Sequence, residues 1–182
     1  INRFMRQLHN DMIIETGKTY YYFDRPQSKV RFICIDTNEV ITEDVSGSTW
    51  QPSFAITQTQ IDWFINLLTN TPNGYKIILC NHIPINNNLR WYSDFCLIFG
   101  DIVEAFNNKT TINKTDSFGI IANADFTNTN GKILLSICGH GHADYFYNSS
   151  SGCVYYEVNC DSRINNGGSQ YTRTDGTISE QS

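Results

Sequence analysis

An apolar segment of strand length that ends in two histidines constrains this 182-residue chain more than any other feature. Residues 132–138 read Lys-Ile-Leu-Leu-Ser-Ile-Cys, and Gly139, His140, Gly141 and His142 follow at once. The segment predicts a core strand, and the glycines allow a tight turn and a close approach of the backbone to an ion. Side chains at i and i+2 of an extended chain point the same way, so both imidazoles can face one point. Because imidazole is the commonest metal ligand, the pattern predicts a metal site or, more plainly, a polar turn after a strand.

The composition is that of one globular domain, and we expect residues 1–182 to form a single unit. The chain is 40% hydrophobic and 17% charged, and its net charge of −5 is spread without a basic stripe. A nucleic-acid partner is therefore not indicated. The apolar runs are far shorter than a membrane span, and no signal peptide opens the chain, so a membrane is not indicated either.

The cysteines are not spaced like a disulfide framework. Cys34, Cys80 and Cys138 lie within or at the end of apolar segments, where small buried hydrophobic side chains are expected. We predict that all three are buried free thiols. The sequence leaves the compartment unknown, but the lack of a disulfide pattern and of a signal peptide favours the cytoplasm.

The expected elements follow one another as in a layered α/β domain. A helix over residues 4–14 precedes a hairpin of strands 19–23 and 29–37, and residues 39–54 are expected to be a loop. Thr57 caps the next helix, with Gln60 completing a capping box. Further along we expect a strand over 75–80, a helix over 92–106, a strand over 132–138 and a hairpin of strands 144–147 and 153–158, whereas residues 107–130 have no clear pattern.

A third histidine follows another apolar strand in the same way. Residues 75–80 form a short apolar segment, and Asn81 and His82 come directly after it. Two strands of one sheet that both end in histidine bring their imidazoles to the same sheet edge, where open α/β sheets place their ligands. One histidine after a strand is commonly a hydrogen-bonded loop residue, but three of the four histidines in matching places favour a site. Asp144, two residues past His142, is either an acceptor that orients a ligand imidazole or an ordinary turn residue.

Together these motifs resemble the carboxyl-terminal half of the calcineurin-like metallophosphoesterases. Residues 78–84 read Ile-Leu-Cys-Asn-His-Ile-Pro, and residues 138–142 follow about sixty residues later as Cys-Gly-His-Gly-His. In that family a hydrophobic strand ends in a lone ligand histidine, and a later strand ends in Gly-His-x-His. The helix that starts after Thr57 also resembles a segment of bacterial and phage members, and the likeness extends from about Tyr20 to Val158.

The resemblance implies a fold, a reaction and a set of ligands. The fold would be α/β, part of a four-layer αββα sandwich with mixed sheets. The enzyme would hydrolyse phosphate mono- or diesters with two divalent metal ions, manganese, iron or zinc, which activate a hydroxide for attack on phosphorus. His82 and His140 would bind one metal and His142 the other, and the resemblance carries no catalytic residue onto this chain.

The chain departs from the family in the motifs that the amino-terminal half supplies. Asp-x-His, the bridging aspartate of Gly-Asp-x-x-Asp and the Asn-His pair that protonates the leaving group do not occur here, and Gly100 with Asp101 lies inside an expected helix. We therefore expect an incomplete domain that is inactive alone, with a phosphate ester and the missing amino-terminal half as its partners. A sheet face left uncovered by that half would invite pairing with another chain.

Two other classes of function remain open. A domain without a hydrolytic role could use His82, His140 and His142 for a single structural or catalytic zinc ion, since three nitrogens and a water complete such a site. A carbohydrate-binding or surface β module is suggested by the 13% of aromatic residues and the many Asn and Thr residues. The strands that end in histidine argue against that module.

Overall fold

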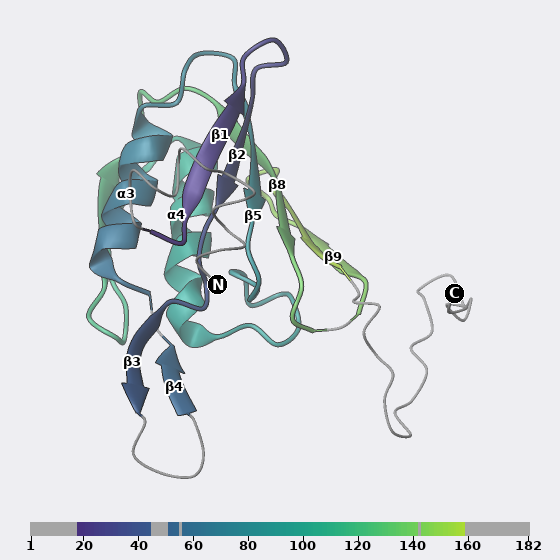
Figure 1. Cartoon of the computed structure of the whole chain (residues 1–182). Helices are drawn as coiled ribbons and strands as arrows, with labels where there is room; N and C mark the ends of the chain where they lie inside the picture. Colours follow the sequence, from purple (N-terminus) through teal and green to yellow (C-terminus); the bar gives the residue numbers. More distant parts are fainter. Residues whose placement is uncertain (1–17, 45–50, 55, 142, 159–182) are drawn as a thin grey trace, which may run out of the picture.

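The computed structural model describes residues 18–44, 51–54, 56–141 and 143–158. Its centre is a six-stranded mixed sheet with the strand order β1-β2-β5-β8-β10-β9 (Figure 1). These strands are β1 (Tyr21–Arg25), β2 (Val30–Cys34), β5 (Lys76–Cys80), β8 (Lys132–Cys138), β9 (Tyr145–Asn148) and β10 (Val154–Glu157). The four central strands β2, β5, β8 and β10 are parallel, and the edge strands β1 and β9 pair antiparallel to their neighbours. The α/β class and the mixed sheet expected from the sequence are confirmed.

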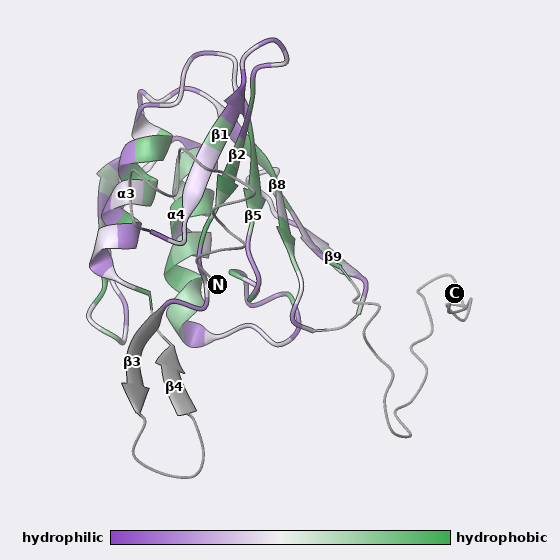
Figure 2. Cartoon of the chain, in the orientation of Figure 1, coloured by the Kyte–Doolittle hydropathy of each residue, from purple (hydrophilic) through white to green (hydrophobic). Residues whose placement is uncertain are grey.

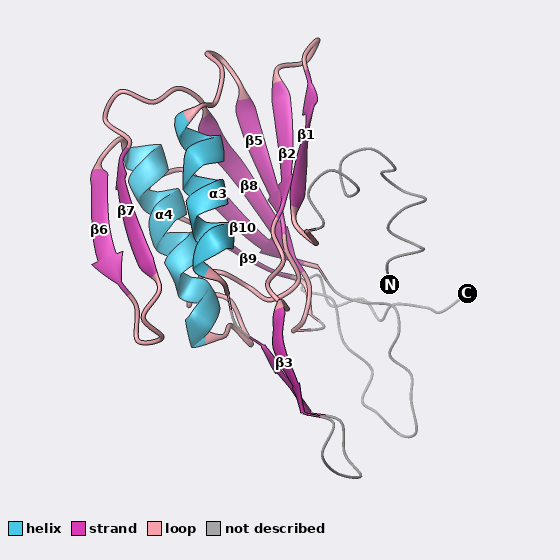
Figure 3. Ribbon diagram, turned by 60° about the vertical axis from the view of Figure 1, so that its left-hand side comes forward, coloured by secondary structure: helices cyan, strands magenta, loops and turns pink. Residues whose placement is uncertain are grey.

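Two helices cover one face of this sheet and form the crossovers between its parallel strands (Figure 3). Helix α3 (Gln58–Thr69) precedes β5, and α4 (Leu97–Asn108) connects β5 to β8. Phe64 of α3 and Phe99 of α4 are fully buried and meet edge to face, with their ring centroids 5.3 Å apart. Figure 2 shows the hydrophobic residues concentrated on the central strands and on α4, where this core lies.

The start of α3 is pinned to the loop that follows β2. The Thr57 hydroxyl accepts from the backbone N–H of Gln60 at 3.3 Å, as a capping residue should. The Gln60 side chain does not complete the capping box, because it bonds both backbone groups of Asp36, at 2.8 and 3.0 Å. The Glu39 carboxylate instead accepts from the backbone N–H of Thr57, the bond that a capping box assigns to the side chain of residue 60. The predicted cap is thus correct in its first half and wrong in its second.

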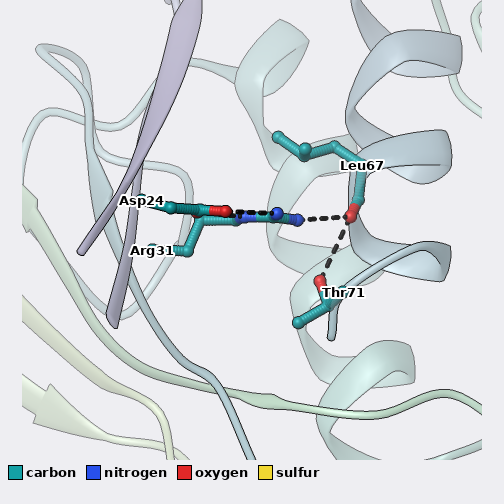
Figure 4. Close-up of polar contacts among 4 residues, drawn as sticks. All are labelled: Asp24, Arg31, Leu67 and Thr71. Atoms are coloured by element: carbon teal, nitrogen blue, oxygen red, sulfur yellow. Dashed lines mark hydrogen bonds and ion pairs between the residues drawn. The ribbon is translucent and has the colours of Figure 1, made fainter. Parts of the chain in front are cut away.

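A buried cation ties the opposite end of α3 to the sheet (Figure 4). Arg31, 5% exposed, forms an ion pair with Asp24 at 2.8 Å and donates to the Leu67 carbonyl at 3.2 Å. The Thr71 hydroxyl donates to the same carbonyl. Burial without partners would be costly for a guanidinium, so these contacts fix the helix against β1 and β2.

Several expected boundaries need correction. Residues 39–54 were expected to be a loop, but they contain the hairpin of β3 (Val40–Asp44) and β4 (Gln51–Phe54). The unpatterned stretch after α4 forms a second hairpin, β6 (Thr111–Thr115) with β7 (Ile121–Asp125), which packs on α3 and α4. The helix expected over 92–106 begins later, with the 3-10 turn η1 (Asp94–Cys96) ahead of α4. The helix expected over 4–14 lies outside the described residues.

The three strand cysteines are free, but only one is buried. Cys138 is buried, whereas Cys34 and Cys80 are half-buried. They are direct neighbours in the register of β2 and β5, on the sheet face away from the helices, which explains their exposure. In the described part of the chain, no helix is long and apolar enough to cross a membrane.

Candidate metal centre

Two of the three candidate histidines meet at the carboxyl ends of neighbouring parallel strands. His82 follows β5, His140 follows β8, and the two strands pair directly. His82 Nε2 and His140 Nδ1 lie 3.2 Å apart, with the ring centroids separated by 5.0 Å and the rings nearly perpendicular. Both side chains are exposed, so an ion or a substrate can reach them. The structure therefore brings these two imidazoles to one point at the sheet edge.

His82 is held by hydrogen bonds to its own backbone and to the backbone N–H of Ile83. The Thr37 hydroxyl accepts from the N–H groups of His82, at 3.2 Å, and of Ile83, at 2.8 Å. The Gly139 N–H donates to the His82 carbonyl at 3.1 Å and links the two strand ends. Thr37 directly follows Asp36, which Gln60 of α3 holds, so the helix start and the histidine belong to one hydrogen-bonded structure.

Asn81 reinforces the same strand end. Its backbone N–H donates to the Ile137 carbonyl at 3.0 Å, which continues the pairing of β5 with β8 beyond Cys80. Its side chain donates to the Ile83 carbonyl at 2.8 Å and accepts from the Ser136 hydroxyl at 3.0 Å. Asn81 thus connects the segment that carries His82 both to Ile83 and to β8.

His140 is held in a strained turn instead. Its φ is 76°, in the left-handed region that side chains rarely adopt. The Gly141 N–H donates to the Gly139 carbonyl at 3.0 Å, which makes His140 the central residue of a γ-turn of the uncommon, strained kind. Backbone strain at a polar residue that meets a second imidazole is typical of functional sites.

The other two candidate residues are not placed among the ligands. His142 lies outside the described residues, so its role as a ligand stays a prediction. Asp144 is half-buried, and the Tyr156 hydroxyl points to its Oδ1 at 3.5 Å. Its expected role as the acceptor that orients a ligand imidazole also stays a prediction.

One acidic residue at this strand end was missed in the sequence. Glu157 ends β10 beside Cys138, and its side chain is 0% exposed. A Cβ placed on Gly141 would lie 1.8 Å from Glu157 Oε1, so the carboxylate lies directly against the backbone of the histidine turn. The alternation of buried Cys153, Tyr155 and Glu157 along one side of the strand is the signal that could have found it.

The thiols before the two histidines differ in their acidity. Burial, and then the charge of Glu157, raise the pKa of Cys138 to about 12. A hydrogen bond from the Cys80 thiol lowers the pKa of Cys34 to about 7, and the same bond together with burial raises the pKa of Cys80. The pair thus loses its first proton readily and holds the second one strongly, as coupled groups do.

The donor set fits a divalent transition-metal ion. His82 Nε2 and His140 Nδ1 lie 3.2 Å apart, and both would bind such an ion through a ring nitrogen. Neutral imidazole suits zinc, iron and, with oxygen ligands, manganese. Among the residues that the structure describes, no three side chains of His, Cys, Asp or Glu are grouped to hold an ion. The described part thus brings two candidate nitrogen ligands together.

Comparison with known proteins gives a likeness at the level of the fold. No family model and no curated protein matches the chain. Among solved structures, the chain is similar to a dimetal phosphatase from Danio rerio, with a TM-score of 0.55 and 13% sequence identity over 82% of this chain. The match covers 52% of that phosphatase, so the chain spans about half its length. At this identity the likeness shows that the chain has the α/β fold of part of a dimetal phosphatase.

Proposed function

We propose that the chain is part of a metal-dependent hydrolase of phosphate mono- or diesters, of the calcineurin-like metallophosphoesterase type. The observation that carries the proposal is the 3.2 Å approach of His82 Nε2 to His140 Nδ1 at the carboxyl ends of β5 and β8. The fold likeness to a dimetal phosphatase supports it. In this proposal His82, His140 and His142 are ligands of a dinuclear centre of manganese, iron or zinc.

The metal pair, when bound, supplies Lewis acidity and an activated water for in-line attack on phosphorus. The residues of this chain would bind the metal ions and orient the ligand side chains. His82 and His140 present neutral ring nitrogens from an exposed edge, where a phosphate ester can approach. Thr37 and the Gly139–Gly141 turn fix the backbone on either side, so that the two nitrogens are held in place before an ion binds.

The proposal includes a second half of the domain that this chain does not supply. A dinuclear centre needs a bridging carboxylate, and the family motif that carries it does not occur in this sequence. The sheet face away from the helices carries half-buried apolar side chains, among them Phe32, which stacks on Phe23 with ring centroids 4.8 Å apart. That face is where a second sheet would pack in a four-layer sandwich.

The test compares the 182-residue chain with a protein extended at its amino terminus, using an activated aryl phosphate and Mn²⁺. We expect turnover from the extended protein and none above background from the chain alone. His82→Ala, His140→Ala and His142→Ala in the extended protein should each abolish most turnover with unchanged circular dichroism. His9→Ala, which changes the one remaining histidine, is the matched control and should retain turnover.

The same experiment distinguishes the proposed hydrolase from the rival zinc-binding domain. If the 182-residue chain binds one Zn²⁺ tightly and the extended protein shows no metal-dependent hydrolysis, the chain is a mononuclear zinc domain. In that outcome the three histidine variants lose zinc, and the proposed hydrolase is wrong.

A further inference from the structure

Glu157 is a fully buried carboxylate beside the strand end that carries His140. Its side chain is 0% exposed, although charged side chains are almost never buried unless they are engaged. The pairing of β10 with β8 places it opposite Cys138, and the Val158 N–H donates to the Cys138 carbonyl at 2.8 Å. Its backbone is therefore fixed next to the residue from which the histidine turn starts.

The Glu157 carboxylate lies against the turn itself. A Cβ on Gly141 would be 1.8 Å from its Oε1 and 2.9 Å from Trp91 Cδ1. Gly141 thus fills the narrow space between a buried carboxylate and an indole ring, and any side chain there would displace one of them.

The turn needs such support. His140 has a φ of 76° within a strained γ-turn, and a residue holds that conformation only when its surroundings over-determine it. One side of the turn is fixed by the Gly139 N–H, which donates to the His82 carbonyl. The other side, at Gly141, is the side that Glu157 touches.

We propose that Glu157 is a positioning residue of the metal centre, whose buried carboxylate holds the Gly139–Gly141 turn so that His140 can share an ion with His82. The inference rests on the proposed function for the ion itself. The inference goes beyond the proposed function because it assigns a role to a residue outside the histidine motifs. Mutation of a residue that orients a metal ligand without binding the metal typically lowers metal affinity by about 10–100-fold.

The test measures Mn²⁺ affinity by electron paramagnetic resonance of the free ion, in the full gene product that carries this chain. Glu157→Gln keeps the shape of the side chain and removes its charge. Gly141→Ala keeps the carboxylate but pushes it out of place. We expect each variant to weaken Mn²⁺ binding about tenfold. The double variant should be weakened about tenfold as well, because both changes act through the same carboxylate of Glu157.

Glu104→Gln is the matched control. Glu104 is a half-buried carboxylate of α4 that accepts from the hydroxyls of Tyr155, at 2.9 Å, and Ser149, at 2.5 Å. Its replacement should lower the melting temperature and leave Mn²⁺ affinity unchanged. A purely structural Glu157 would behave in the same way as this control.

Each outcome has a distinct meaning. If Glu157→Gln binds Mn²⁺ like the unchanged protein while His140→Ala loses it, the inference is wrong and the proposed function stands. A hundredfold, additive loss in the double variant also overturns it, because Gly141 would then act independently of Glu157. If His140→Ala binds Mn²⁺ normally, the proposed function itself fails, and the inference fails with it.

Discussion

The two strand ends that meet at the candidate metal centre position the same side chain by different means. At the end of β5, both backbone groups of His82 are hydrogen-bonded, and the Thr37 hydroxyl accepts from two successive N–H groups. At the end of β8, His140 has a φ of 76° inside a three-residue turn. The thiols that end the two strands differ as well, since Cys80 donates a hydrogen bond to Cys34 and Cys138 is buried beside Glu157.

The difference shows that one of the two candidate ligands, His140, is positioned at an energetic cost. Hydrogen bonds hold His82, and its φ is not in the left-handed region. His140 adopts a conformation that costs about 1–3 kcal/mol and depends on the surrounding fold. Changes near β8 should therefore affect the site through backbone strain, and changes near β5 through lost hydrogen bonds.

The largest contrast is expected in thiol reactivity. The thiolate is the nucleophile, and its population at pH 7 is about half for a pKa near 7 and about 10⁻⁵ for a pKa near 12. We expect iodoacetamide to label the Cys34–Cys80 pair more than about a thousandfold faster than Cys138. The labelling rate should rise with pH and level off above about pH 7, because the lowered pKa makes the thiolate dominant there.

Peptide mapping by mass spectrometry measures this contrast. Cys80→Ala removes the donor that stabilises the Cys34 thiolate and should slow the labelling of Cys34 at pH 7. Equal labelling of Cys34 and Cys138 in the folded protein would contradict the difference between the two strand ends.

Metal affinity should depend on both histidines alike. His82→Ala or His140→Ala removes one of two converging nitrogens, and we expect Mn²⁺ or Zn²⁺ affinity to fall by more than about a hundredfold. Isothermal titration calorimetry measures the loss. His9→Ala should bind as the unchanged protein does. A large loss at only one of the two positions would show that the imidazoles do not share an ion.

The approach of His82 to His140 was predictable from the strands that precede them. The apolar segments before His82 and His140 were correctly predicted to be strands of one sheet, and the structure pairs them directly in parallel, which brings their carboxyl ends together. The left-handed φ of His140 was not predictable, because glycine on either side permits many turns and only the tertiary contacts select one. Glu157 was missed because its burial is indicated only by its alternation with Cys153 and Tyr155 along β10, which was not followed to the end of the strand.

The fold was predictable where the periodicity was strong. The predicted β8 has the observed bounds, and α3 begins where Thr57 indicated. The β6–β7 hairpin was missed because each strand buries a single side chain, Ile112 and Ala122, which is too little alternation to detect. The β3–β4 hairpin was missed because β4 contains Pro52, a residue that argues against a strand.

A moderate effect is expected from the hydroxyl that holds the β5 end. Thr37 is 1% exposed, and Thr37→Val removes the acceptor of two backbone N–H groups while keeping the shape of the side chain. We expect the free energy of unfolding to fall by about 2 kcal/mol. Thr37→Ser keeps the acceptor and should lose no more than about 1 kcal/mol, for one buried methyl group. Urea unfolding followed by circular dichroism measures both, and equal losses would show that the hydroxyl does not hold His82.

The smallest effect tests the strain directly, through the difference between alanine and glycine at each histidine position. The side chain is removed in both variants, so the difference reports only the backbone. At position 140 the left-handed φ disfavours alanine, and we expect His140→Gly to be more stable than His140→Ala by about 1 kcal/mol. At position 82, which is not left-handed, glycine only adds freedom to the unfolded chain, and His82→Gly should be less stable than His82→Ala by about 0.5–1 kcal/mol. Urea unfolding of the metal-free variants measures both differences. The opposite signs are the decisive feature, since a uniform effect of glycine would give the same sign at both strand ends and would show that His140 is not strained.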